Sequence, residues 1–173
     1  MDLWALDEVH FCQHGSRCRM WIPPEGKDPI VLHHPTRKSV GYFGAVRHRE
    51  GRFIFTREVH RFDGQTFLDF LKKVQMHSRS RGRRVEVIMD NAKYHHAKLH
   101  AHWREQHHAR FALNFLPPYS PELNPIERVW KLLRRLRLHD QYFATLEEVI
   151  QAVEAQFGAW QYGSEALRKL CAL

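Results

Sequence analysis

Apolar and polar residues alternate along the first part of the chain in the pattern of short β-strands. Residues 3–9 form a mostly apolar run that carries an acidic pair, and they predict a buried first strand. Residues 19–22 predict a second, shorter strand. Residues 40–47 and 52–59 are rich in β-branched and aromatic side chains and flank a short turn, so they predict a β-hairpin.

Helical spacing of apolar residues begins after the hairpin. Residues 65–78 predict an amphipathic helix, and residues 85–89 then predict a core strand that leads directly into Asp90. A helix at about 95–107 and a strand at 111–115 follow. This part of the chain therefore alternates between helices and strands.

Two capped helices are predicted in the last third of the chain. Asn124 is expected as the N-cap of the first, with Pro125 at its first position and Glu127 at its third. Thr145 and Glu148 form a capping box at the start of the second. The apolar stripes are Val129, Trp130, Leu133 and Leu136 on the first helix, and Leu146, Val149, Ile150, Val153, Phe157 and Trp160 on the second. We expect both tryptophans in the core.

The order of these elements is typical of an α/β protein with a mixed central sheet flanked by helices. The 173 residues fit one domain. No apolar run is long enough to cross a membrane, and no signal peptide precedes the first strand, so we expect a soluble protein with no membrane partner. The three cysteines, Cys12, Cys18 and Cys171, form no even disulfide framework, which favours a reducing compartment, the cytoplasm.

Charge and cysteine content narrow the range of partners. The chain has 27 Lys and Arg against 19 Asp and Glu, a formal net charge of +8, which favours a polyanion such as nucleic acid, although many basic proteins bind none. Cys12 and Cys18 lie near His10 and His14, but this spacing lacks the paired half-sites of a zinc cluster.

Three acidic residues have the positions that phosphodiester chemistry requires. Asp7 and Asp90 lie at or near strand ends, and Glu127 lies at a helix start, where three carboxylates could hold two Mg²⁺ ions. Each also has a purely structural interpretation as a turn, cap or ion-pair residue. Asp7 and Glu8 face opposite sides of a strand, and spacing alone does not choose between them.

Two longer motifs resemble a known family. Residues 90–95 (DNAKYH) and 116–130 (LPPYSPELNPIERVW) closely resemble the DDE transposases of the mariner superfamily, in particular their bacterial insertion-sequence branch. The resemblance implies an RNase H-like fold, cut-and-paste transposition of DNA and dependence on two Mg²⁺ or Mn²⁺ ions. It makes Asp7, Asp90 and Glu127 the catalytic triad and the metal ligands.

The resemblance also suggests supporting residues and partners. Asn91 and His95 match motif positions that support the site or the DNA end, and Asn124 is expected to fix the helix start. As alternatives, Asn91 and His95 could be ordinary cap or surface residues. DNA is the expected partner, with assembly of a homo-oligomer on the element ends.

The sequence departs from the family pattern in two ways. The spacing between Asp90 and Glu127 is slightly longer than usual, which loop insertions readily tolerate. Family members normally begin with a helix-turn-helix region, whereas residues 1–173 are expected to form the catalytic domain alone. We therefore expect either a separate DNA-binding subunit or a truncated remnant.

Basic residues near the third acid are candidate DNA contacts. They lie off the apolar stripe of the Glu127 helix, although a solvated helix face is the alternative. They are Arg128, Lys131, Arg134, Arg135 and Arg137. A second basic cluster comprises Arg79, Arg81, Arg83 and Arg84. The histidines near residues 95–108 fall on several helix faces, so we expect them at the surface.

The sequence thus predicts a transposase catalytic domain that cleaves element ends and transfers strands. A catalytically inactive DNA-binding remnant or domesticated protein is the main alternative, and a general RNase H-like nuclease is the third. DNA joining separates the first from the third, and metal-dependent nicking separates both from the second.

Overall fold

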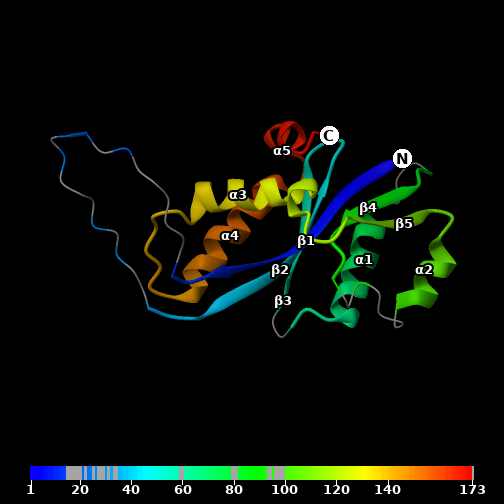
Figure 1. Cartoon of the computed structure of the whole chain (residues 1–173), viewed down its shortest axis with the longest axis horizontal. Helices are drawn as coiled ribbons and strands as arrows, with labels where there is room; N and C mark the ends of the chain where they lie inside the picture. Colours follow the sequence, from blue (N-terminus) through cyan, green and yellow to red (C-terminus); the bar gives the residue numbers. More distant parts are fainter. Residues whose placement is uncertain are drawn as a thin grey trace.

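The fold is built on a mixed five-stranded sheet. The computed structural model describes residues 1–14, 21, 23–24, 26, 30, 32, 35–58, 61–78, 82–92, 95 and 100–172. The strands are β1 (Asp2–Cys12), β2 (Ser39–Arg47), β3 (Arg52–Glu58), β4 (Val85–Met89) and β5 (Phe111–Phe115). Their order is β3-β2-β1-β4-β5. The pairs β1–β2 and β2–β3 are antiparallel, whereas β4 and β5 run parallel to β1. The long strand β1 runs through the middle of the molecule (Figure 1).

Helices cover both faces of this sheet. They are α1 (Gly64–Ser78), α2 (Ala101–His107), α3 (Ile126–Arg137), α4 (Leu146–Trp160) and α5 (Glu165–Leu170), with a short 3₁₀ turn at Pro121–Leu123. Side chains of α3, α4 and α5 share one apolar cluster with alternate residues of β1, β2 and β3. Side chains of α1 share a second cluster with the intervening residues of β1 and β2 and with β4. Successive residues of β1 therefore face two different helical layers.

Most of the predicted elements are confirmed. The hairpin, the first helix and the strands at 85–89 and 111–115 lie where the pattern predicts them. Thr145 caps α4 by accepting a hydrogen bond from the Glu148 amide at 3.3 Å. Trp130 and Trp160 are buried core residues, as expected.

Several expectations need correction. Of the helix expected at about 95–107, the structure describes α2 over Ala101–His107, and residues 96–99 lie outside the described residues. The helix α5 has no counterpart in the prediction. Leu136 is exposed, because the apolar stripe of α3 ends in the core at Leu133. His95 and His100 are fully buried rather than at the surface. The strand expected at 19–22 lies outside the described residues, except for Trp21, which is not in a strand.

The start of α3 also differs by one residue from the expected cap. The N-cap position is held by Pro125 and the helix begins at Ile126. Asn124 still acts as a capping side chain, because its Oδ1 accepts a 3.4 Å hydrogen bond from the Ile126 amide. Among the residues that the structure describes, no helix is long and apolar enough to cross a membrane.

Candidate active site

Asp7 lies on the face of β1 that is covered by α3. Its Oδ2 accepts a 3.0 Å hydrogen bond from the indole Nε1 of Trp130, a buried residue of α3. Asp7 pairs with Gly44 on β2. A Cβ atom on Gly44 would lie 2.3 Å from the Trp130 ring, so only glycine allows the indole to lie this close to β2. The first acid is therefore held in place by a neighbouring strand and a helix.

Asp90 follows directly after β4, beside Asp7. Ala5 pairs with Ile88 in the parallel β1–β4 ladder, and Asp7 and Asp90 each lie two residues further along their strands. Adjacent strands are separated by about 4.8 Å, so both carboxyl groups emerge side by side where β4 ends. Asp7 itself lies within β1 rather than at the strand end expected from the sequence, because β1 continues to Cys12. The topology thus brings together two acids that are far apart in the sequence.

Glu127 reaches the same place from the first turn of α3. The buried side chain of Asn124 fixes this turn to the sheet, because its Nδ2 donates a 3.0 Å hydrogen bond to the carbonyl of Leu6. At the other side of the turn, the thiol of Cys171 lies 3.7 Å from the carbonyl oxygen of Pro125. The start of α3 is therefore held between β1 and the segment after α5.

The three predicted acids line one cavity. Its volume is about 450 Å³, and Asp7, Asp90, Asn91 and Glu127 all contribute to its walls. The loop before α3 supplies much of the remaining lining. That part of the lining consists of Leu116, Pro117, Pro118, Tyr119, Ser120, Pro121 and Asn124. The sequence motif of residues 116–130 thus forms one side of the cavity and carries the third acid.

Burial and neighbouring acids shift the pKa of Asp7. Burial, followed by the charge of Glu8, raises the pKa of Asp7 to about 7. The hydrogen bond from Trp130 lowers the pKa and the charge of Glu127 raises it, so these smaller effects partly cancel. A carboxyl group of this kind favours either a proton or a metal cation as a partner at neutral pH.

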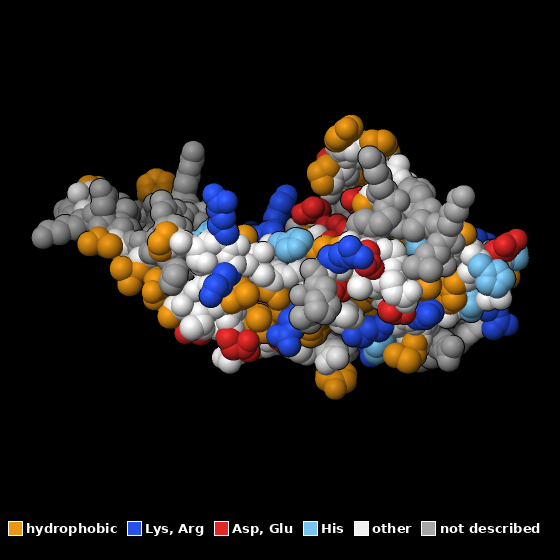
Figure 2. Space-filling view, turned by 90° about the horizontal axis from the view of Figure 1, so that it is seen from below, with side chains coloured by type: hydrophobic (Ala, Val, Ile, Leu, Met, Phe, Trp, Pro, Cys, Tyr) orange, Lys and Arg blue, Asp and Glu red, His pale blue; other side chains and the backbone are white. Residues whose placement is uncertain are grey.

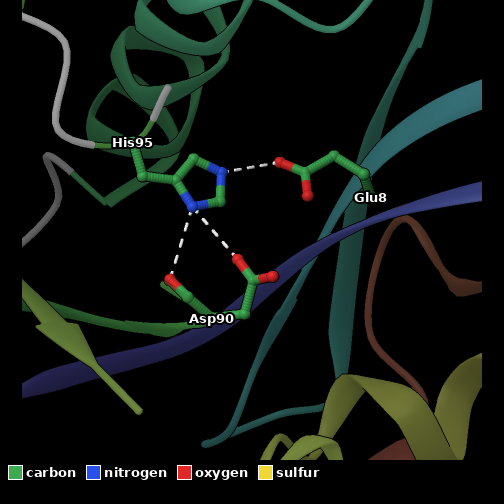
Figure 3. Close-up of side chains that lie close together, drawn as sticks. All are labelled: Glu8, Asp90 and His95. Carbon is green, nitrogen blue, oxygen red and sulfur yellow. Dashed lines mark hydrogen bonds and ion pairs between the residues drawn. The ribbon is translucent and has the colours of Figure 1, made fainter. Parts of the chain in front are cut away.

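Glu8 lies on the opposite face of β1 and contacts a different residue. Its Oε1 lies 2.9 Å from Nε2 of His95, and Nδ1 of His95 lies 3.1 Å from Oδ1 and 3.3 Å from the backbone oxygen of Asp90. Figure 3 shows the imidazole ring lying between the two carboxyl groups. The ring is fully buried and packs against Phe67 of α1, with ring centroids 4.4 Å apart. Glu8 therefore bonds to His95 while Asp7 lines the cavity.

The charges of Glu8, His95 and Asp90 stabilise one another. Burial alone would lower the pKa of His95, but hydrogen bonds to Asp90 and Glu8 outweigh it and raise the pKa to about 9. The hydrogen bond from His95 lowers the pKa of Asp90. With both ring nitrogens protonated, the imidazolium donates to both acids at neutral pH.

The predicted DNA contacts on α3 differ in their surroundings. Arg128 donates hydrogen bonds to the backbone oxygens of Leu170 and Ala172, and Arg137 donates to Gln156. The guanidinium of Arg134 lies over the Phe11 ring, 5.5 Å from its centroid. Lys131 and Arg135 complete the predicted set.

No single dense basic patch marks a binding surface on the face drawn in Figure 2, where Lys and Arg side chains are spread out. In the second basic cluster, Arg84 forms a 2.8 Å ion pair with Glu86, and Arg83 lines a separate cavity. Arg79 and Arg81 lie outside the described residues. The α3 helix therefore stays the better candidate for contacts close to the acids.

Three residues of the site have contacts or positions that the sequence pattern does not predict. Trp130 was expected only in the core, yet its indole also donates to Asp7. The sequence does not decide between Glu8 and Asp7 as the first acid, and the alternation along β1 does not predict the contact of Glu8 with His95. Tyr119 is fully exposed at the cavity wall and has a positive φ of 59°. Its place within the longer motif was the only available signal.

Comparisons with known proteins show the family and the fold of this chain. The family described as DDE superfamily endonuclease matches residues 2–150. The crystal structure of the Mos1 mariner paired end complex with Mn is similar with a TM-score of 0.73 and 16% identity, over 98% of this chain and 51% of that chain. The catalytic domain of Mos1 mariner transposase is similar with a TM-score of 0.61 and 14% identity, over 98% of this chain and 78% of that one.

The likeness to solved structures confirms the expected RNase H-like fold. This chain spans about half the length of the chain in the paired end complex. An uncharacterized protein of Sinorhizobium fredii, y4pE/y4sA, is 45% identical over 38 residues, which cover 22% of this chain and 28% of that protein.

Proposed function

This chain belongs to the DDE superfamily endonucleases, and from that premise we propose that it is the catalytic domain of a DNA transposase. Its substrate would be the phosphodiester bonds at the ends of a mobile element, which it would cleave and then join to target DNA. Asp7, Asp90 and Glu127 are the proposed catalytic residues. A domesticated or inactive remnant is the alternative, and no contact described above favours it.

The single observation that carries the proposal is the convergence of these acids on one cavity. Asp7 is half-buried there, and its raised pKa reflects both burial and neighbouring carboxylates. Oxygen ligands from a few carboxyl groups are what Mg²⁺ and Mn²⁺ prefer, and a divalent cation would relieve the repulsion among them. The donor set therefore fits the proposed metal.

The residues of the chain would act mainly by holding these ligands still. Trp130 orients one oxygen of Asp7, and Asn124 ties the start of α3 to β1, so that the Glu127 helix cannot move away from the sheet. Asn91 lies in the cavity wall and could contact the DNA end. When bound, two such cations would activate the attacking oxygen and neutralise charge on the leaving oxygen.

The proposed partner is DNA, and Lys131 and Arg135 on α3 are the best candidates for phosphate contacts near the cavity. We propose that Arg134 adds to these contacts, and that Arg128 and Arg137 act mainly within the fold. Assembly of several copies on the element ends, a separate helix-turn-helix subunit and a bacterial cytoplasmic setting belong to the same proposal.

The proposal is tested with a supercoiled plasmid and a duplex that carries the terminal sequence flanking the reading frame. We expect nicking and joining in Mg²⁺ or Mn²⁺, and a loss of at least about a thousandfold in Glu127→Gln, because a metal ligand is removed. Glu122→Gln is the matched control, since Glu122 is exposed in the 3₁₀ turn just before α3. Nicking without joining would indicate a general nuclease, and equal activity in both variants would contradict the assigned site.

A further inference from the structure

The contact between Glu8, His95 and Asp90 has no counterpart among the proposed cleavage steps. Asp90 lines the cavity that also contains Asp7 and Glu127, whereas Glu8 and His95 do not line it. The imidazole of His95 connects Glu8 to Asp90 through two contacts of 2.9 and 3.1 Å. A buried ion-paired group therefore reaches the cavity from the opposite face of β1.

We propose that Glu8 and His95 form a positioning relay that fixes the Asp90 carboxylate in one orientation for cation binding. The inference rests on the proposed function, because it gives Asp90 the role of a metal ligand. Neither Glu8 nor His95 touches the reacting groups in this proposal. They act through Asp90.

The position of Asp90 explains why such a relay is needed. Its side chain is 53% exposed and follows the last residue of β4, where the strand ladder no longer holds it. A half-exposed carboxylate at a strand end would otherwise rotate freely, and its ordering on cation binding would cost free energy. His95 removes this freedom before the cation binds, which lowers that cost.

The contacts on Asp90 also leave one oxygen for the cavity. The hydrogen bonds from the His95 ring and from the Ala92 amide, at 3.1 and 3.4 Å, both use Oδ1. Within the described part of the chain, no hydrogen bond to Oδ2 is present. One oxygen is therefore anchored while the other stays available as a ligand.

His95 is in turn immobilised by its surroundings. The ring is fully buried, packs against Phe67, and would carry a large desolvation cost if either nitrogen lacked a partner. Glu8, whose side chain is only 13% exposed, supplies the partner for Nε2. Removing Glu8 would leave that nitrogen without its acceptor and loosen the ring that holds Asp90.

Direct cation binding by Glu8, Asp90 and His95 is the competing interpretation. One ligand atom from each lies within 4.8 Å of the others, a spacing that a metal site could have. Both ring nitrogens of His95, however, already face carboxyl oxygens, so the imidazole itself occupies the place of a cation. A positioning relay requires no rearrangement of the contacts among Glu8, His95 and Asp90.

The relay is tested by measuring Mn²⁺ affinity of the DNA-free chain by electron paramagnetic resonance, together with urea unfolding. His95→Gln and Glu8→Ala are expected to weaken Mn²⁺ binding about 10- to 100-fold, which is typical when the partner of a metal ligand is lost. Glu8→Gln keeps an oxygen acceptor for His95 and should stay within about threefold of the parent. Asp90→Asn marks the effect of losing the ligand itself.

Two matched controls separate the relay from general damage to the fold. Glu86 lies on the neighbouring strand β4, is 16% exposed and is ion-paired with Arg84, so Glu86→Gln removes a comparable charge away from the cavity. His100 is also fully buried and packs against Phe67, so His100→Gln reports on a similar loss of packing. Both controls should keep parental Mn²⁺ affinity.

The outcomes distinguish failure of the relay from failure of the proposed function. If the parent binds Mn²⁺ and the His95 and Glu8 variants bind it equally well, the relay is wrong and the proposed function stands. If Glu8→Gln loses binding as completely as Asp90→Asn, Glu8 is itself a ligand and the relay is overturned. A parent chain that binds no Mn²⁺ would overturn the proposed function and the relay together.

Discussion

At the scale of single residues, the site is held in an unfavourable electrostatic state. Asp7 is half-buried near Glu8 and Glu127, and its pKa of about 7 records the cost of charging it there. The hydrogen bond from Trp130 recovers only part of that cost. A carboxyl group kept in such surroundings lowers the stability of the metal-free fold, and this is common for residues selected for function.

This cost predicts how stability depends on pH. The folded-state pKa of Asp7 lies above its unfolded value of 3.8, so its stabilising contribution is present below pH 4 and is lost as pH rises through about 7. Asp7→Asn removes this loss. In EDTA we expect the variant to gain roughly 2–4 kcal/mol in unfolding free energy over the parent between pH 4 and pH 8.

Urea unfolding of both proteins at the two pH values measures this difference. Asp69→Asn is the control, because Asp69 is an exposed acid of α1 whose contacts, an ion pair with Lys72 and a hydrogen bond from Gln65, both lie at the surface. A difference between Asp7→Asn and the parent that does not change with pH would show that Asp7 titrates normally.

At the scale of elements, α3 has both an apolar and a basic face, and parts of the basic face already have structural contacts. Arg128 bonds to backbone oxygens just after α5, and Arg137 bonds to Gln156 of α4. The helix thus serves as the support of Glu127 and as a link to the last two helices. Lys131 and Arg135, which form no ion pair with any described residue, are the positions of α3 most available for the proposed phosphate contacts.

These different surroundings predict different effects of alanine substitution. Lys131→Ala and Arg135→Ala should each reduce the slope of log affinity against log salt by about one unit for a DNA duplex, because each removes one phosphate contact. Arg128→Ala should instead lower the unfolding free energy by about 0.5–1 kcal/mol and leave the slope nearly unchanged. Fluorescence anisotropy over a salt series and urea unfolding provide the two readouts. A lower slope in Arg128→Ala alone would assign the phosphate contact to Arg128 instead of Lys131 and Arg135.

At the scale of the whole molecule, a net charge of +8 surrounds a cavity lined by acids. The overall charge would attract the proposed DNA partner, while the carboxylates would repel any phosphate that enters the cavity. Divalent cations bound in the cavity would neutralise the carboxylates and remove this repulsion. DNA affinity should therefore depend on the charge state of the cavity as well as on the basic surface.

This conflict predicts that inactivating substitutions improve DNA binding when metal is absent. In EDTA at pH 8, Asp7→Asn and Glu127→Gln should each raise affinity for a short duplex about two- to fivefold, as expected for one repulsive charge removed near a phosphate. Glu122→Gln serves as the control for an acid outside the cavity lining. Unchanged affinity in both cavity variants would mean that DNA does not approach these carboxylates.

The sequence predicted the fold more completely than the interior of the site. Alternation and helical spacing located all five strands and the helices α1, α3 and α4, because each of these buries a regular apolar stripe. The helix α5 was missed because it is short and buries only Leu167. The burial of His95 and His100 was missed because periodicity does not report which loop residues fold back under α1.

The choice between Asp7 and Glu8 shows where such reasoning stops. Both are acids in one strand, and the pattern establishes that they face opposite sides without indicating which side holds the cavity. That choice depends on Gly44 and Trp130, two residues far away in the sequence whose packing only the folded chain brings together. Tertiary contacts, rather than local propensity, determine which acid reaches the cavity.

The hydrogen bond from Trp130, whose indole packs closely on Gly44, to Asp7 also favours the correct alignment of β1 against β2. If β1 slipped by one residue against β2, Glu8 would turn toward the α3 layer and Asp7 would be buried among the aromatic rings beneath α1. Phe43 or Ala45 would then stand opposite Asp7 in place of the glycine. The Trp130 indole would also lose its carboxylate acceptor, so the register that places Asp7 at the cavity is the favoured one.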